Sequence, residues 1–138
     1  MLTSKNIIKW VLVAALTVVV LGCARIAPLY NPPEIAVPQG MTQKQVGDAV
    51  LSALPRRGWV VDKAQPGLII ASVSPRGHTA TVQIQYDTQA VRVSYQSSEN
   101  LDYSVKDGQP MIHKNYNSWV QNLVGDIRTE LSRYYINK

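Results

Sequence analysis

The feature that most constrains the fold is a run of strict alternation in the middle of the chain. From His78 to Tyr86 apolar and polar side chains take turns. Ala80, Val82, Ile84 and Tyr86 fall on one side, and Thr79, Thr81, Gln83 and Gln85 fall on the other. Because successive side chains of a strand point to opposite faces, this pattern predicts a strand of an antiparallel sheet with one buried and one wet face.

Three further stretches near this strand carry strand signals. Residues 59–64 and 68–73 precede it, and residues 91–95 follow it with apolar side chains at alternate positions. The stretches are separated by segments rich in turn formers, namely Gln65-Pro66-Gly67, Ser74-Pro75-Arg76-Gly77 and Asp87-Thr88-Gln89. Strands joined by such short turns are usually neighbours in space, so the sequence predicts a four-stranded antiparallel meander.

Helical periodicity flanks the sheet on both sides. Before it, Thr42 and Gln45 have the spacing of a capping box, and the apolar residues that follow have helical spacing: Val46, Ala49, Val50, Ala53 and Leu54. After it, one apolar stripe runs for about five turns through Tyr116, Trp119, Val120, Leu123, Val124, Ile127, Leu131 and Tyr134. Gly125 interrupts this second helix at a cost of about 1 kcal/mol relative to alanine, and we expect a close approach to the sheet there.

These elements combine into an α+β fold. Each helix has one apolar side and the sheet has one apolar face, and all are buried when both helices cover the same face. We therefore expect residues 41–138 to form a single domain. Its architecture is a two-layer sandwich in the order helix, four-stranded antiparallel meander, helix, with the polar face of the sheet left to solvent.

The first 22 residues are typical of an export signal. Lys5 and Lys9 precede an uncharged, almost wholly apolar run at residues 10–22. A membrane-spanning helix needs about 20 apolar residues, so a permanent span is the weaker alternative. Removal of the two lysines lowers the formal net charge from +5 to +3. This small excess does not indicate nucleic acid as a partner, but it favours anionic partners in the cell envelope.

The run ends in Val20-Leu21-Gly22-Cys23, which resembles the lipobox of bacterial lipoprotein precursors. The resemblance implies that Cys23 carries a diacylglyceryl group, that a signal peptidase cuts before it, and that its new amine is acylated with a fatty acid such as palmitate. Ala24 follows instead of the aspartate that retains enteric lipoproteins in the inner membrane. The resemblance thus implies a lipid anchor on the periplasmic face of the outer membrane. Cys23 is the only cysteine, which excludes a disulfide framework.

Four of the eight prolines lie between Ala24 and Gly40. They are Pro28, Pro32, Pro33 and Pro38. Proline fixes its own φ and holds the preceding residue extended, so residues 23–40 are expected to be the lipidated N-terminus and a tether. Ile35 and Val37 alternate with Glu34 and Ala36, which leaves a short edge strand as the alternative for this part.

One segment between the last strand and the last helix is dense in hydrogen-bonding side chains. Its candidate binding residues are Asn100, Tyr103, His113, Asn115 and Asn117. Arg57-Gly58-Trp59, Ser98 to Leu101, and the Ile-His-x-Asn-Tyr-Asn-x-Trp of residues 112–119 resemble a family of small proteobacterial lipoproteins without a known activity. In one interpretation these side chains cap the last helix and satisfy loop backbone, with His113 as a hydrogen-bonding strut. In the other they surround the helix N-terminus and bind an anionic group.

Clusters that carry catalysis or bind metal are missing from the sequence. His78 and His113 are the only histidines, and the isolated glycines form no phosphate-binding loop. The sequence therefore predicts a non-catalytic module without cofactor or metal, anchored in the membrane by lipid, that binds an envelope protein or peptidoglycan. Two alternatives remain open: an enzyme or accessory factor that acts on cell-wall substrates through His113, and a structural or stress lipoprotein without a defined ligand.

Overall fold

The computed structural model describes residues 24–137. The predicted export signal and the lipidation site Cys23 lie outside the described residues. Within them the chain forms two α-helices, α2 (Gln43–Ala53) and α3 (Lys114–Ile136). The strands are β1 (Ile26–Pro28), β2 (Ile35–Ala36), β3 (Val60–Gln65), β4 (Leu68–Val73), β5 (Thr79–Tyr86), β6 (Ala90–Glu99), β7 (Ser104–Lys106) and β8 (Gln109–His113). The described chain also has two short 3-10 helices, η2 (Leu54–Arg57) and η3 (Pro75–Gly77).

The larger sheet has five antiparallel strands in the order β2-β6-β5-β4-β3. The four strands expected from the sequence are β3 to β6, and each pairs with the next along the chain. The fifth strand, β2, pairs Ile35 with Val91 and Ala36 with Ala90 at the edge of β6. The α+β class is confirmed, but the prediction of a four-stranded sheet is corrected to five strands in this sheet.

A second sheet of three strands, β1-β8-β7, was not expected. β8 pairs with β1 on one side and with β7 on the other, so much of the polar segment 97–117 is a hairpin. Asp107 and Gly108 form its turn with positive φ angles of 51° and 76°. Positive φ at both central residues is the requirement of a tight two-residue hairpin turn.

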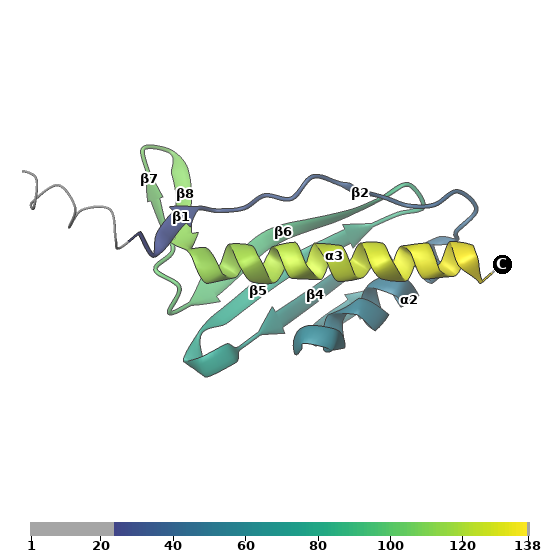
Figure 1. Cartoon of the computed structure of the whole chain (residues 1–138), viewed down its shortest axis with the longest axis horizontal. Coiled ribbons are helices and arrows are strands. Elements are labelled where there is room, and N and C mark those ends of the chain that lie inside the picture. Colours follow the sequence, from purple (N-terminus) through teal and green to yellow (C-terminus); the bar gives the residue numbers. More distant parts are fainter. Residues whose placement is uncertain (1–23, 138) are drawn as a thin grey trace, which may run out of the picture.

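The core lies between the larger sheet and the two helices. Figure 1 shows α2 and α3 side by side across the sheet. The predicted capping box of α2 is confirmed, because the Gln45 amide donates to Thr42 Oγ1 at 3.2 Å and the Thr42 amide donates to Gln45 Oε1 at 2.8 Å. The buried residues include Val46, Val50 and Leu54 from the first helical segment, Ile69, Ala71, Val82, Ile84, Val91 and Val93 from the sheet, and Val120, Leu123, Val124, Ile127 and Leu131 from α3.

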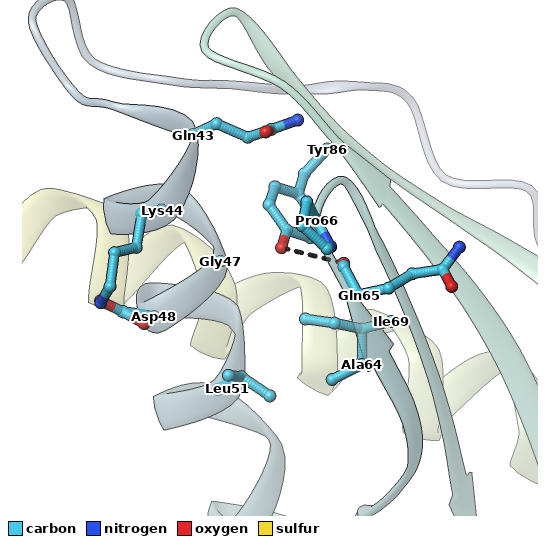
Figure 2. A pocket seen from close by; sticks show the side chains of 10 residues that line it. All are labelled: Gln43, Lys44, Gly47, Asp48, Leu51, Ala64, Gln65, Pro66, Ile69 and Tyr86. Atoms are coloured by element: carbon cyan, nitrogen blue, oxygen red, sulfur yellow. Dashed lines mark hydrogen bonds and ion pairs between the residues drawn. The ribbon is translucent and has the colours of Figure 1, made fainter.

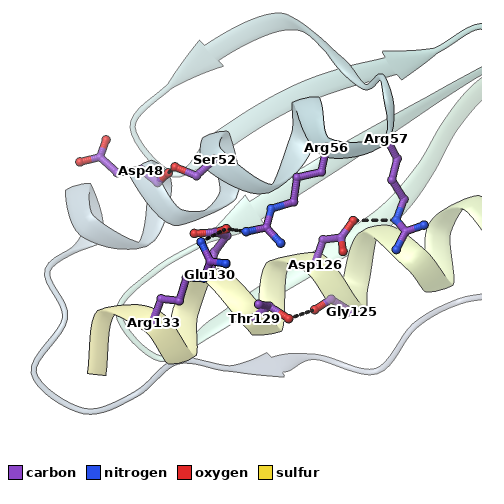
Figure 3. A network of polar contacts seen from close by, with 9 residues as sticks. All are labelled: Asp48, Ser52, Arg56, Arg57, Gly125, Asp126, Thr129, Glu130 and Arg133. Atoms are coloured by element: carbon purple, nitrogen blue, oxygen red, sulfur yellow. Dashed lines mark hydrogen bonds and ion pairs between the residues drawn. The ribbon is translucent and has the colours of Figure 1, made fainter. Parts of the chain in front are cut away.

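Ion pairs connect η2, the 3-10 helix that follows α2, with α3 (Figure 3). Arg56 in η2 pairs with Glu130 of α3, and Arg57 pairs with Asp126 at 2.8 Å. Arg133 also approaches Glu130, at 3.7 Å. The segment after α2 is thereby joined to the C-terminal half of α3. Arg56 and Arg57 form these contacts within the fold.

Residues 24–40 pack against the domain and do not extend away from it as a tether. β1 and β2 belong to the two sheets, Ile35 is buried, and Leu29 and Tyr30 pack against the core. The chain between the two strands runs along α3 (Figure 1). The prolines do not prevent this, because the extended backbone that they favour is also that of an edge strand. The alternative of a short edge strand is confirmed at Ile35–Ala36.

Candidate functional site

The predicted binding residue Asn100 closes a loop. Its backbone has a positive φ of 57°, and its side-chain amide donates to the carbonyl of Gly77 at 2.8 Å. Its own carbonyl accepts a hydrogen bond from Nδ1 of His78 at 2.7 Å. Both contacts join the end of β6 to the η3 turn, so the side-chain amide nitrogen and the carbonyl of Asn100 have partners within the fold.

His113 caps α3. Its ring Nδ1 accepts a hydrogen bond from the Asn115 amide at 3.1 Å, and the neighbouring amide of Lys114 donates to the carbonyl of Arg25 at 2.9 Å. Two of the free amides at the start of the helix are therefore already occupied. The hypothesis of an anion site needs those amides, and the geometry favours the interpretation of His113 as a structural strut.

Asn117 and Tyr103, the other two predicted residues, contact other parts of the fold. The side chain of Asn117 accepts from the Tyr30 amide at 2.8 Å and donates to the Pro28 carbonyl at 2.9 Å, which holds the N-terminal segment. Tyr103 stacks on Tyr95 with ring centroids 4.6 Å apart. The structure thus brings His113 and Asn115 together at the start of α3 but directs the other three toward separate neighbours.

Residues 24–137 carry neither a metal-binding cluster nor a membrane-spanning helix. In this range no group of three or more histidine, cysteine or acidic residues is placed to hold a metal ion. No helix in the same range has the length and apolar character needed to cross a bilayer.

A groove between α2 and the β3–β4 hairpin is the candidate site (Figure 2). Its volume is about 450 Å³, and its walls are mainly apolar. It is lined by Gln43, Lys44, Gly47, Asp48 and Leu51 of α2, by Ala64, Gln65, Pro66 and Ile69 of the hairpin, and by Tyr86 at the end of β5. None of the five residues singled out from the sequence lines it.

The groove exists because the helices do not cover the last strand of the sheet. In β3, Val61 pairs with Ala71 and Ala64 pairs with Ile69. Paired residues of an antiparallel sheet point to the same face, so Val61 and Ala64 point toward the helix side, where Ala71 and Ile69 are buried. Val61 is nevertheless 39% exposed, and Leu51 on α2 is 37% exposed. Ala64 on the hairpin wall and Leu51 on the helix wall are thus open to solvent, and Val61 adds an exposed apolar side chain on the same face of β3.

Tyr86 closes one end of the groove against the backbone of α2. A Cβ atom added to Gly47 would lie 2.6 Å from the Tyr86 hydroxyl oxygen, so the ring fits only because residue 47 lacks a side chain. The Tyr86 hydroxyl donates a long bond of 3.5 Å to the Gln65 carbonyl. On the rim, Lys44 pairs with Asp48 at 2.8 Å, and this hydrogen bond raises the pKa of Lys44.

The outer edge of β3 adjoins the groove. In the described part of the chain β3 has a partner strand on one side only, since it ends the order of the sheet. Its backbone carries a bulge between Val61 and Lys63. A bulge and a lysine are common protections against uncontrolled pairing of an edge strand. Productive pairing at this edge therefore needs a partner whose side chains also fit the groove.

The comparisons with family models, curated proteins and solved structures found no match. The functional interpretation therefore depends on the geometry of the chain itself. One sequence signal for the groove was available: Leu51 lies off the helical stripe formed by Val46, Ala49, Val50, Ala53 and Leu54. An apolar residue outside the buried stripe of a short helix indicates either a second contact or an exposed surface.

Proposed function

We propose that this chain is a non-catalytic, lipid-anchored protein of the bacterial envelope that binds an extended peptide segment of another envelope protein. The binding site is the groove between α2 and β3. In this proposal the fold is the two-layer sandwich expected from the sequence, extended by β2. Its helices cover the middle of the larger sheet and leave β3 uncovered on the same side.

The observation that carries the proposal is the exposure of apolar side chains directly beside a free strand edge. Leu51 and Ala64 are exposed on opposite walls of the groove, and Val61 is exposed on the same face of β3. The outer edge of β3 is available for backbone hydrogen bonds. An extended peptide satisfies both features at once. Its backbone pairs with the strand, and every second side chain enters the groove.

The chemistry of the groove favours a protein over peptidoglycan. Sugars and cell-wall peptides are polar and carry carboxylates, whereas the groove is mainly apolar and its rim charges, Lys44 and Asp48, already neutralise each other. Its volume of about 450 Å³ suits apolar side chains of a bound peptide.

The anchor and the location rest on the first residues of the chain. The apolar run at residues 10–22, the single cysteine at its end and Ala24 after it support export, lipidation of Cys23 and residence on the periplasmic face of the outer membrane. Several acyl chains on one residue make such an anchor effectively permanent. An enzymatic function through His113 is not favoured, because the ring of His113 is engaged as a helix cap.

In-cell photo-crosslinking of the full-length protein tests the proposal. A photoreactive residue at Ala64 reports on the groove, and matched probes at Gln83 on the wet sheet face and at Asn100 in the loop serve as controls. We expect a discrete adduct from position 64 alone, with a second envelope protein identified by mass spectrometry. Adducts only from positions 83 or 100 would refute the groove as the site. An adduct between two copies of this chain would refute a different envelope protein as the partner and show self-association.

A further inference from the structure

The described part of the chain begins almost directly at a strand. β1 starts at Ile26, three residues after Cys23. A chain advances at most about 3.6 Å per residue, so the Cα atoms of residues 23 and 26 lie within about 11 Å of each other. Arg25 is itself held in place, because its carbonyl accepts the Lys114 amide at 2.9 Å. An anchor on Cys23 would therefore be joined to the β1-β8-β7 sheet by two residues only, of which Arg25 is held by the fold.

This end of the molecule presents apolar and aromatic side chains to solvent. Val105 in β7 is 58% exposed, and Tyr103 just before it is 42% exposed. On the opposite face of β7 from Val105 lies a hollow of about 500 Å³, lined by Ala24, Arg25, Ile26, Asp102, Ser104, Lys106 and Met111. Tyrosine is favoured at the interface between a membrane and water, because its ring is apolar and its hydroxyl is polar.

The same end also carries basic residues that are not neutralised. Arg25, Lys106 and Lys114 form no ion pair with any described residue. Three acidic residues, Glu99, Asp102 and Asp107, lie in the adjoining segments and equal these three basic residues in number. Each unpaired basic side chain is nevertheless able to pair with a lipid phosphate.

We infer that the β1-β8-β7 end rests on the phospholipid surface that holds the anchor. Val105 and Tyr103 reach the headgroup region, and Arg25, Lys106 and Lys114 lie against lipid phosphates. This inference rests on the proposed lipidation of Cys23. It follows from the short connection, because a domain joined to its anchor by so few residues has little freedom to turn away.

The orientation places the groove away from the membrane. The β1-β8-β7 sheet lies beside the first turn of α3, whereas α2 lies beside its C-terminal half (Figure 1). A helix of 23 residues is about 35 Å long. The groove therefore faces the periplasm, where a peptide of another protein can reach it.

Spin labelling of the lipidated protein tests the orientation. Cys23 is the only cysteine and its thiol is consumed by the lipid, so Val105→Cys introduces a single free thiol. Gln65→Cys, at the β3–β4 turn, is the matched control. Both are labelled in vesicles of phosphatidylethanolamine and phosphatidylglycerol, and the intact mass first establishes the acyl chains on Cys23. We expect the label at position 105 to be relaxed more strongly by oxygen than by a water-soluble nickel chelate, and the label at position 65 to show the reverse.

The outcomes separate the two claims. If the acyl chains are present and both labels are equally accessible to the chelate, the orientation is wrong and the anchor stands. If the mass shows no acyl chains on Cys23, the anchor of the proposed function fails and the orientation fails with it. A further variant, Lys106→Glu in the Val105→Cys protein, is expected to increase chelate access several-fold, whereas Lys63→Glu on β3 is expected to leave it unchanged. Equal effects of the two charge changes would contradict the role of Lys106.

Discussion

Two glycines occupy helix interiors, Gly47 in α2 and Gly125 in α3, and their surroundings differ. A Cβ at Gly47 would meet the Tyr86 ring, whereas a Cβ at Gly125 would meet nothing within 4 Å. The expectation that Gly125 marks a close approach to the sheet was therefore wrong, because this residue faces solvent. The close approach occurs at Gly47, where the groove is formed.

The two glycines predict opposite effects of the same substitution. Gly125→Ala should raise the free energy of unfolding by about 0.5 to 1 kcal/mol, since alanine restricts the unfolded chain and the site is open. Gly47→Ala should lower it, because the rigid Tyr86 ring must move. Urea denaturation of both variants checks this. Equal changes in the two midpoints would contradict the packing described at Gly47.

Tyr116 predicts a loss of stability in alkali. The residue is 1% exposed, and burial raises its pKa well above the ordinary value of 10.0, with a smaller contribution from Tyr95. A raised pKa in the folded state contributes stability that is complete below about pH 10 and is lost as the pH rises toward the folded pKa. The free energy of unfolding should fall by up to about 1.4 kcal/mol per pH unit in that window.

The matched variant is Tyr116→Phe, which keeps the ring and removes the ionisable group. Chemical denaturation between pH 8 and pH 11 should show a shallower decline for this variant than for the native protein. Parallel curves would mean that the pKa of Tyr116 is the same in the folded and the unfolded state.

At the scale of elements, the long and periodic segments could be predicted and the short ones could not. The capping box of α2, the stripe of α3 and the alternation of β5 each extend over enough residues to define a period. β1, β2 and β7 have two or three residues each, which is too few for alternation to appear. Their pairing is decided by distant contacts, such as that of Ile26 with His113. The Asp107-Gly108 turn was the one local signal for the second sheet.

The attachment of the N-terminal segment to α3 is testable at a single side chain. Asn117→Ala removes the bonds to Pro28 and Tyr30 and should cost about 1 to 3 kcal/mol, because both backbone groups lose a partner. Hydrogen exchange at the Tyr30 amide should accelerate in parallel. Asn115→Ala is the control, since the Asn115 side chain forms no hydrogen bond with the described residues and only its backbone takes part in the cap. Equal effects of both variants would argue against a specific role of Asn117.

At the scale of the whole molecule, the candidate site could not be predicted from residue types. The five polar residues expected to form it are Asn100, Tyr103, His113, Asn115 and Asn117. The side chains of Asn100 and Asn117 bond to parts of the fold that lie far along the chain, whereas Tyr103 and His113 contact near neighbours. Polar loop residues that close a fold and those that bind a ligand have the same composition. The groove is instead lined mainly by apolar residues. That the exposed Val61 lies on the same face of β3 as the groove becomes apparent only from the register of β3 on β4.

The central claim is that the groove beside β3 binds a peptide of an envelope protein, and the neighbouring valines of β3 test it most directly. Val61 points to the groove side, and Val60, which pairs with Ser72 and is 63% exposed, points to the opposite face. Val61→Glu places a charge on the groove side of β3, on the same face as the lining residue Ala64, whereas Val60→Glu makes the same change on the other face. The measurement is the yield of the adduct from the photoreactive residue at position 64. The account predicts loss of the adduct with Val61→Glu and retention with Val60→Glu, and equal yields from the two folded variants would contradict it.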